Sequence, residues 1–133
     1  NMPNHIAKQL VKKMRQKKIK INNANILIMG LAFKENCNDL RNTQVINLYK
    51  NLDELCNIYI YDPLIESKIA KEIHNINLIE YPIKKYYDAI IIAVAHDIFK
   101  KLGVKKIKDF CKSNSIIYDL KYLLSSEDSD IRL

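Results

Sequence analysis

Short apolar runs alternate with stretches of helical spacing along the chain. The apolar runs predict β-strands at residues 25–30, 57–62, 77–80, 87–95 and 115–119. Apolar residues spaced three and four apart predict helices at residues 3–18, 43–55, 67–74, 98–102 and 104–112. The run at 87–95 is the most apolar and is rich in β-branched residues, so we expect a central strand buried on both faces. This alternation is typical of an α/β domain.

Strands that are separated by helices run parallel and are joined by right-handed crossovers. We therefore expect a three-layer Rossmann-like α/β domain, with a mostly parallel sheet of about five strands and helices on both faces. Asn42 is placed to cap the helix at 43–55, and the acidic tail at 125–130 is expected to fray. Ligands of such sheets bind beyond the carboxyl ends of the strands, which selects residues 30–34, 61–63, 96–97 and 120–121.

The size and composition suit one soluble domain with a hydrophobic core. The chain has 133 residues, of which 48% are hydrophobic and 28% charged. Its longest apolar run falls far short of the roughly 18 residues that span a bilayer, and no secretion signal is recognisable at the start. Three widely spaced cysteines predict neither a disulfide framework nor a zinc site, so we expect a cytoplasmic protein.

Positive charge is concentrated at the beginning of the chain. The formal net charge is +7, yet residues 1–34 carry +8 and the remainder sums to −1. A basic helix attracts nucleic acid or an acidic membrane surface. Alternatively, it is a solvated helix face that packs against another part of a larger protein, and the charge pattern alone leaves both interpretations open.

The loop after the first predicted strand carries the most chemistry. It reads GLAFKENCNDLRNT, from Gly30 to Thr43. A dinucleotide site needs several glycines at this turn, and the loop has one, so we do not expect the chain to hold NAD by itself. The ring of Phe33, the ammonium of Lys34 and the guanidinium of Arg41 suit a base or sugar and its phosphates. The structural alternative places Phe33 in the core and Lys34 in solvent.

This loop resembles the G-x-[AT]-F-K and D-x-R-x-[ST] segments of the UDP-glucose/GDP-mannose dehydrogenase family, at the start of its carboxyl-terminal UDP-binding domain. The leading NMP, YDP at 61–63, YDAIIIAVAH at 87–96 and YDLK at 118–121 agree with the family in order and spacing. The resemblance implies that residues 1–20 are the end of a preceding linker helix. Residues 21–133 would then be the UDP-sugar-binding domain of a three-domain enzyme.

The resemblance also implies roles for single residues. Phe33, Lys34 and Lys121 would contact the UDP-sugar substrate, and Arg41 would reach the cofactor side of the cleft between domains. Some family members have arginine where this chain has Lys121, which argues against a bidentate contact there. The nucleophilic cysteine and the glycine-rich NAD-binding domain lie elsewhere in such enzymes. We therefore expect no catalytic residue in this chain, and no activity from the chain alone.

The family oxidises the C6 alcohol of a nucleotide sugar to a carboxylate and passes two hydrides to NAD. The segments AVAH at 93–96 and FKENCNDLRNT most resemble the branch that acts on UDP-N-acetylhexosamines in surface polysaccharide synthesis, with UDP-glucose as the other candidate substrate. The implied partners are the NAD-binding and central helical domains of the same protein and further copies in a homo-oligomer, without nucleic acid or membrane. The rival interpretation is a stand-alone Rossmann-like module that binds nucleic acid through its basic first helix.

The cysteines and one aspartate have ordinary structural explanations. Cys37 has no evident base beside it, and Cys56 and Cys111 suit small apolar positions near helix ends. Asp62 could bind a ribose, but its place before Pro63 favours a turn.

Two histidine features remain to be placed. His96 and Asp97 could form an acid–base pair, or Asp97 could cap the following helix, and the sequence leaves both open. His5 and His74 have no other ligand types at metal spacing, so no metal site is expected.

Overall fold

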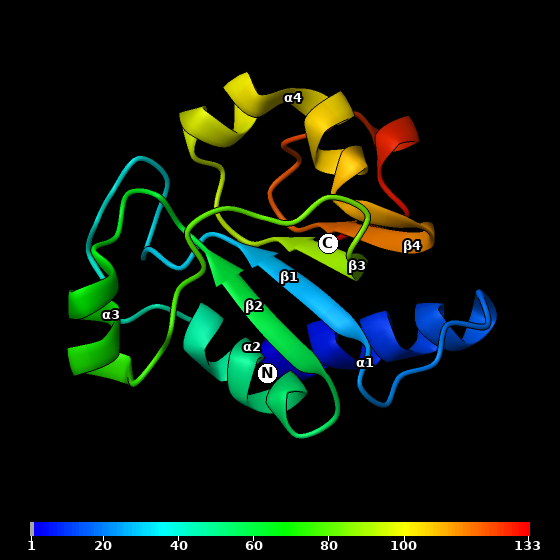
Figure 1. Cartoon of the computed structure of the whole chain (residues 1–133), viewed down its shortest axis with the longest axis horizontal. Helices are drawn as coiled ribbons and strands as arrows, with labels where there is room; N and C mark the ends of the chain where they lie inside the picture. The colour runs from blue at the N-terminus through cyan, green and yellow to red at the C-terminus, as the bar shows by residue number, and fades with distance from the viewer. Residues whose placement is uncertain (1) are drawn as a thin grey trace.

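A five-stranded sheet forms the centre of the computed structural model, which describes residues 2–133. The strands are β1 (Asn25–Met29), β2 (Asn57–Tyr61), β3 (Tyr87–Ile92), β4 (Cys111–Asp119) and β5 (Ile131–Arg132), in the order β2-β1-β3-β4-β5 (Figure 1). Every neighbouring pair is parallel. The chain winds from β1 to one edge and then returns to β3 on its other side, so the winding direction reverses between β1 and β3. The expected fold class is confirmed.

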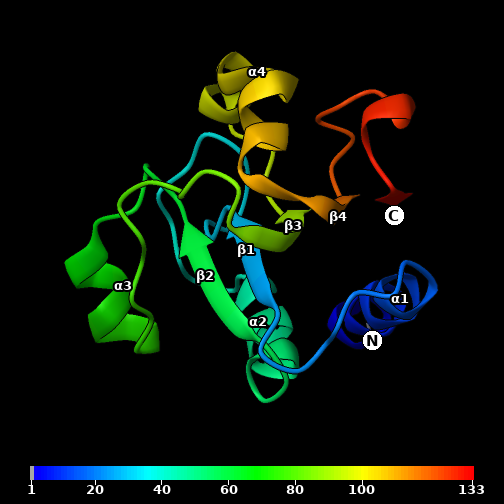
Figure 2. The same cartoon turned by 45° about the vertical axis from the view of Figure 1, so that its right-hand side comes forward.

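Helices cover both faces of this sheet. The α-helices are α1 (Met2–Gln16), α2 (Val45–Asp53), α3 (Ser67–His74) and α4 (Asp97–Asp109), and a short 3-10 helix, η1, spans Ser126–Asp128. Helices α1 and α2 lie under one face and α4 lies over the other, while α3 lies beside the edge strand β2 (Figures 1 and 2). The three layers predicted from the alternating pattern are therefore present.

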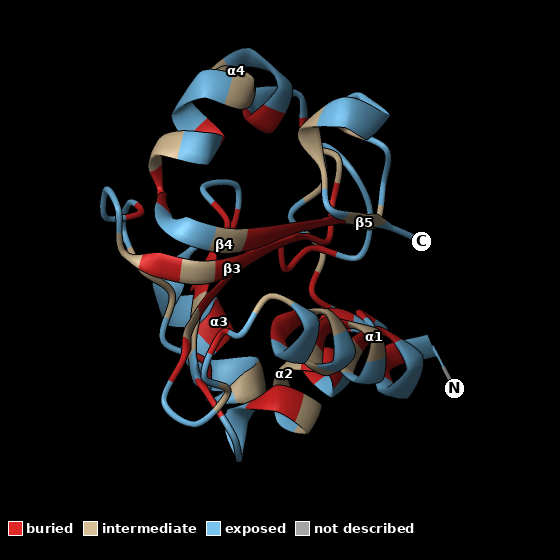
Figure 3. Ribbon diagram, turned by 90° about the vertical axis from the view of Figure 1, so that its right-hand side faces the viewer, coloured by how far each residue is buried: buried red, intermediate tan, exposed pale blue. Residues whose placement is uncertain are grey.

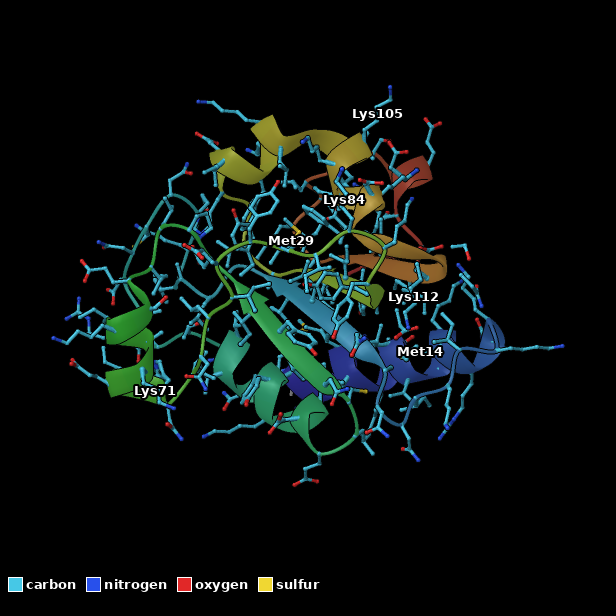
Figure 4. All side chains as sticks on the ribbon, in the orientation of Figure 1. Met14, Met29, Lys71, Lys84, Lys105 and Lys112 are labelled. Carbon is cyan, nitrogen blue, oxygen red and sulfur yellow. The ribbon has the colours of Figure 1, made fainter. Side chains whose placement is uncertain are left out.

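Alternating side chains of the strands feed two separate hydrophobic clusters. In β1, Ile26 and Ile28 belong to the cluster between the sheet and helices α1 and α2, whereas Leu27 and Met29 belong to the cluster between the sheet and α4. Met14 of α1 and Met29 therefore belong to opposite sides of the sheet (Figure 4). Figure 3 shows burial along the inner strands and exposure on the outer faces of the helices. Both faces of the sheet are covered, which explains the nearly continuous apolar runs in its strands.

Helix α1 contributes directly to the core. Leu10 and Met14 are completely buried and Ile6 nearly so, all in the same cluster as β1. The opposite side of the helix is exposed and basic. Within residues 2–133, no helix is both long and apolar enough to cross a membrane.

The tail is ordered, so the prediction that residues 125–130 fray is wrong. The carboxylate of Asp130 accepts the backbone N–H of Ile117 at 2.8 Å and lies 3.4 Å from the ammonium of Lys17. Residues 131–132 then pair with β4 as a fifth strand. Composition suggested a solvated tail, but contacts with partners 13 and 113 residues away hold it.

The start of α2 also differs from the prediction. Asn42 has a left-handed φ of 60° and does not cap the helix, which begins at Val45 with Gln44 in the capping position. The hydroxyl of Thr43 accepts the backbone N–H of Val45 instead, at 3.2 Å. The expected capping role of Asn42 is therefore wrong.

Other element boundaries also differ from the prediction, because contacts between distant segments determine where they lie. Gly103, with φ 85° and ψ 160°, interrupts α4 where the sequence predicted two helical segments. Strand β4 begins at Cys111, before the predicted 115, because the pairing with β3 shifts register between Tyr87 and Ala89. The run at 77–80 contributes one bridge, between Leu78 and Ile60.

Candidate functional site

The site is built on the turn that follows β1. Gly30 has a φ of 105°, and a Cβ added there would lie 2.5 Å from the Cβ of Val94. Its N–H donates to the carbonyl of Tyr61 at 2.8 Å. Only glycine permits both this backbone conformation and the close approach of the loops after β1 and β3.

Asp62, directly after β2, binds the start of the loop that follows Gly30. Its Oδ2 accepts the backbone N–H groups of Leu31 at 2.8 Å and Ala32 at 3.0 Å. Its Oδ1 accepts the N–H of Leu64 at 3.0 Å, which confirms the predicted turn. Because both oxygens are occupied inside the protein, Asp62 does not face a ribose.

His96, after β3, completes this buried network. Its Nε2 lies 3.0 Å from Oδ2 of Asp62, and both side chains are fully buried. Its Nδ1 lies 2.9 Å from the backbone nitrogen of Asn36, whose N–H can only donate. Nδ1 must therefore be the acceptor, which makes His96 the neutral tautomer with its proton on Nε2, directed at Asp62.

The balance of forces on Asp62 keeps it ionised. Burial acts to raise the pKa of this carboxyl, but the hydrogen bonds from His96, Leu31 and Ala32 together with the electrostatic attraction of His96 outweigh it, so the pKa is lowered. A buried anion is thus satisfied by four donors, three on Oδ2 and the N–H of Leu64 on Oδ1, that hold the rim of the sheet together.

The loop of residues 31–42 is closed on itself and fastened at its tip. The N–H of Phe33 donates to the carbonyl of Asp39 at 2.8 Å. At the tip, Oδ1 of Asn36 accepts the N–H of Asp97 at 2.8 Å, while the N–H of Asn36 donates to His96. Neither interpretation of Asp97 holds: His96 pairs with Asp62, and His96, not Asp97, occupies the capping position of α4.

The structure brings the three predicted substrate residues together. Phe33, Lys34 and Lys121 line one pocket of about 190 Å³ beyond the carboxyl ends of the strands. Ala32, Glu35, Asn42, Gln44, Val45, Ala93 and Val94 complete its wall. The ring of Phe33 is 53% exposed, so the alternative that places it in the core is wrong.

The pocket is suited to an anion with an aromatic or sugar group. Within residues 2–133, the ammonium groups of Lys34 and Lys121 form no ion pair, whereas Glu35 is the single acidic residue of the wall. Gln44 and Val45 place the amino end of α2 on the same wall, and the helix dipole there favours negative charge, although the N–H of Val45 itself donates to Thr43.

Asp119 fixes the backbone beside Lys121. This fully buried carboxylate accepts the N–H groups of Lys121 at 3.2 Å, Leu123 at 3.1 Å and Leu124 at 2.8 Å. Sequence reasoning missed Asp119, as it missed Asn36. The repeated YD at the ends of strands, in YDP at 61–63 and YDLK at 118–121, was the available signal for a buried aspartate that binds the following loop.

Arg41 lies outside this pocket. Its Nε lies 3.0 Å and its terminal nitrogen 2.9 Å from the two carboxylate oxygens of Asp39, and its side chain is 82% exposed. The hydrogen bonds from Arg41 lower the pKa of Asp39 to about 2. Arg41 therefore pairs with Asp39 within its own loop.

The cysteines are free thiols in ordinary positions. Cys56 and Cys111 are buried, and burial raises the pKa of each thiol. Cys37 is partly exposed, and its sulfur accepts the N–H of Asp39. Among residues 2–133, no group of three or more His, Cys, Asp or Glu side chains is arranged to hold a metal ion.

A parallel α/β sheet with a cationic pocket beyond its reversal point defines a ligand-binding domain of the Rossmann type. The family model for the UDP-glucose/GDP-mannose dehydrogenase family, UDP binding domain, matches residues 27–126. The chain belongs to this family, which confirms the resemblance noted in the sequence.

Curated relatives agree with this assignment. The chain is 40% identical to the UDP-N-acetyl-D-glucosamine 6-dehydrogenase of Salmonella typhi, over 100% of this chain and 32% of that protein. It is 41% identical to the enzyme of the same name from Pseudomonas aeruginosa, over 97% of this chain and 31% of that protein. The chain therefore spans about a third of the length of these relatives.

A solved structure supports the fold. The UDP-D-ManNAc dehydrogenase from Pyrococcus horikoshii superposes with a TM-score of 0.75 at 23% identity, covering 94% of this chain and 28% of that one. Neither the family match nor these similar proteins favour a nucleic-acid-binding module.

Proposed function

We propose that this chain is the nucleotide-sugar-binding domain of an NAD-dependent UDP-sugar 6-dehydrogenase. The observation that carries the proposal is the pocket in which Phe33, Lys34 and Lys121 meet. Its two ammonium groups form no ion pair within residues 2–133 and lie beside an exposed ring. The names of the two bacterial relatives favour UDP-N-acetyl-D-glucosamine as the substrate. Oxidation of its C6 alcohol would supply a uronic acid for surface polysaccharide synthesis in the cytoplasm.

Each group that lines the pocket has a role in the proposed substrate binding. The ammonium groups of Lys34 and Lys121 bind the diphosphate, whose charge the amino end of α2 also stabilises. The ring of Phe33 covers a face of the base or sugar. These groups hold and orient the substrate, and the nucleophile for the oxidation belongs to other parts of the protein.

The turn after β1 does not fit NAD. A dinucleotide pyrophosphate needs free N–H groups at such a turn. Here the N–H groups of Leu31 and Ala32 donate to Asp62, and Gly30 is the only glycine of the loop. We therefore assign NAD binding mainly to a separate domain of the same protein, with Arg41 reaching toward the cofactor from the exposed side of the loop. Central helical domains and a homo-oligomer complete the proposed assembly.

Calorimetric titration of the full-length protein with UDP tests this function. Replacing Lys34 with alanine should weaken UDP binding roughly 10- to 150-fold, the loss expected for a hydrogen bond to a charged group, and should lower turnover without unfolding the protein. Lys105→Ala serves as the matched control because Lys105 is exposed on α4 (Figure 4) and does not line the pocket.

Two results would contradict the proposal. One is UDP binding and kinetics of Lys34→Ala that equal those of the unsubstituted protein, which would leave Lys34 merely solvated. The other is competition for the site by unrelated oligonucleotides with a steep salt dependence, as the nucleic-acid alternative requires.

A further inference from the structure

A completely buried histidine at the rim of the sheet has no place in the binding proposed above. His96 lines no part of the pocket, yet it is 0% exposed and paired with an equally buried Asp62. Burying two titratable groups costs free energy unless each polar atom is satisfied, and here each is. An apolar residue would fill the same space, so the polar contacts of His96 need a reason.

Those contacts lead to the loop that carries Phe33 and Lys34. The loop is fastened at four levels: Leu31 and Ala32 to Asp62, Phe33 to Asp39, Asn36 to the turn before α4, and the carbonyl of Leu40 to His74 of α3. Among the hydrogen bonds of residues 2–133, only those of Asn36 connect residues 34–38 to a segment outside the loop. Lys34 lies two residues from Asn36.

The tip attachment is reciprocal and depends on the tautomer of His96. Asn36 donates its N–H to Nδ1 of His96 and accepts the N–H of Asp97 on its side chain, at 2.9 and 2.8 Å. Nδ1 can accept only while the proton sits on Nε2, and the carboxylate of Asp62, 3.0 Å from Nε2, keeps it there. Asp62 therefore acts on the loop twice, once directly and once through the ring.

We propose that His96 is a positioning residue for the substrate pocket: its Nδ1 holds Asn36, and so keeps Lys34 and Phe33 at the pocket wall. Without this acceptor the loop tip samples other conformations, and the apparent affinity falls in proportion to the competent fraction. The inference deepens the proposed function and rests on it.

Two conservative variants separate the contacts of His96. In His96→Asn the side-chain oxygen can replace Nδ1 as the acceptor for Asn36, while the contact with Asp62 is lost. In His96→Gln the amide nitrogen can replace Nε2 as the donor to Asp62, while the acceptor for Asn36 is lost. Both variants disturb the same buried site, so their melting temperatures measure the structural cost alone.

The experiment is titration of the full-length protein and both variants with UDP, together with melting curves. We expect His96→Gln to raise the dissociation constant for UDP about tenfold and His96→Asn to raise it no more than about threefold, although both melt earlier. A role in stability alone predicts that affinity follows the melting temperature, or does not change. Equal weakening in both variants, or an unchanged His96→Gln, would overturn the inference.

A pair of surface variants covers the case in which His96 variants do not fold. Asn36→Gly keeps the left-handed conformation, φ 57°, and the N–H that donates to His96, but it removes the acceptor for Asp97, the other half of the attachment that holds the loop tip. Asn38→Gly removes an exposed side chain of the same loop. We expect weaker UDP binding in the first and not in the second; equal affinities would overturn the inference. If the unsubstituted protein binds no UDP, the proposed function fails as well, and that result is distinct from a failure of His96 alone.

Discussion

At the residue scale, the site depends on the lack of a Cβ atom at Gly30. Gly30→Ala would place a Cβ 2.5 Å from that of Val94 in a backbone with φ 105°. We expect it to reduce the free energy of unfolding by about 3 kcal/mol or more, from backbone strain and overpacking together. Urea unfolding measures the change. Gly103→Ala is the comparison, because its φ of 85° is also strained but no atom lies within 4 Å of the added Cβ; equal losses would exclude the clash with Val94 as the cause.

Arg41 allows a second prediction at this scale. If it contacts the pyrophosphate of NAD, Arg41→Ala in the full-length protein should raise the KM for NAD roughly 10- to 150-fold and change the KM for the UDP-sugar less. The exposed pair with Asp39 contributes little to stability, so the melting temperature should barely change. Steady-state kinetics and a melting curve give both quantities.

The competing role for Arg41 is to brace the loop against Asp39. That role predicts a lower melting temperature with both KM values altered together, and Asp39→Asn should then reproduce the effect. A falling melting temperature with an unchanged KM for NAD would make the cofactor role wrong.

At the scale of elements, α1 is bound into the domain by one narrow face. Leu10 is completely buried against the sheet, whereas its neighbour Val11 is half-buried on the surface between α1 and α2. Leu10→Ala should cost about 2–5 kcal/mol of unfolding free energy and Val11→Ala less than about 1.5 kcal/mol. Chemical denaturation of both variants tests this. Similar small losses would mean that α1 is only loosely attached to the sheet.

At the scale of the whole molecule, Asp62 makes stability depend on pH. Its pKa in the folded protein is lowered, so the unfolded chain binds this proton more readily as the pH falls. The stabilisation is complete above the ordinary pKa of about 4 and is lost as the pH falls through the lower folded value. Unfolding free energies between pH 6 and pH 2 should therefore decrease more steeply for the unsubstituted protein than for Asp62→Asn. The difference in slope cannot exceed about 1.4 kcal/mol per pH unit, and parallel curves would contradict the assignment.

Most elements were predictable because period and length are local properties. The run at 87–95 contains the central strand β3, which ends three residues earlier at Ile92, and residues 67–74 form α3 with the expected bounds. The predictions that Asn42 caps α2 and that residues 125–130 fray were wrong because neither feature depends on its immediate sequence alone. The hydroxyl of Thr43 accepts the N–H of Val45 at the helix start, and the carboxylate of Asp130 accepts the N–H of Ile117.

The sequence by itself determined the α/β alternation, the loop motif with Phe33 and Lys34, and through that motif the family. The tertiary structure alone decided that Arg41 turns to Asp39 and that His96 binds Asp62 rather than Asp97. The physical reason is separation along the chain. Periodicity reports which face of an element is buried, whereas a hydrogen bond between residues 34 positions apart depends on strand order and register, which place Asp62 and His96 at one rim of the sheet.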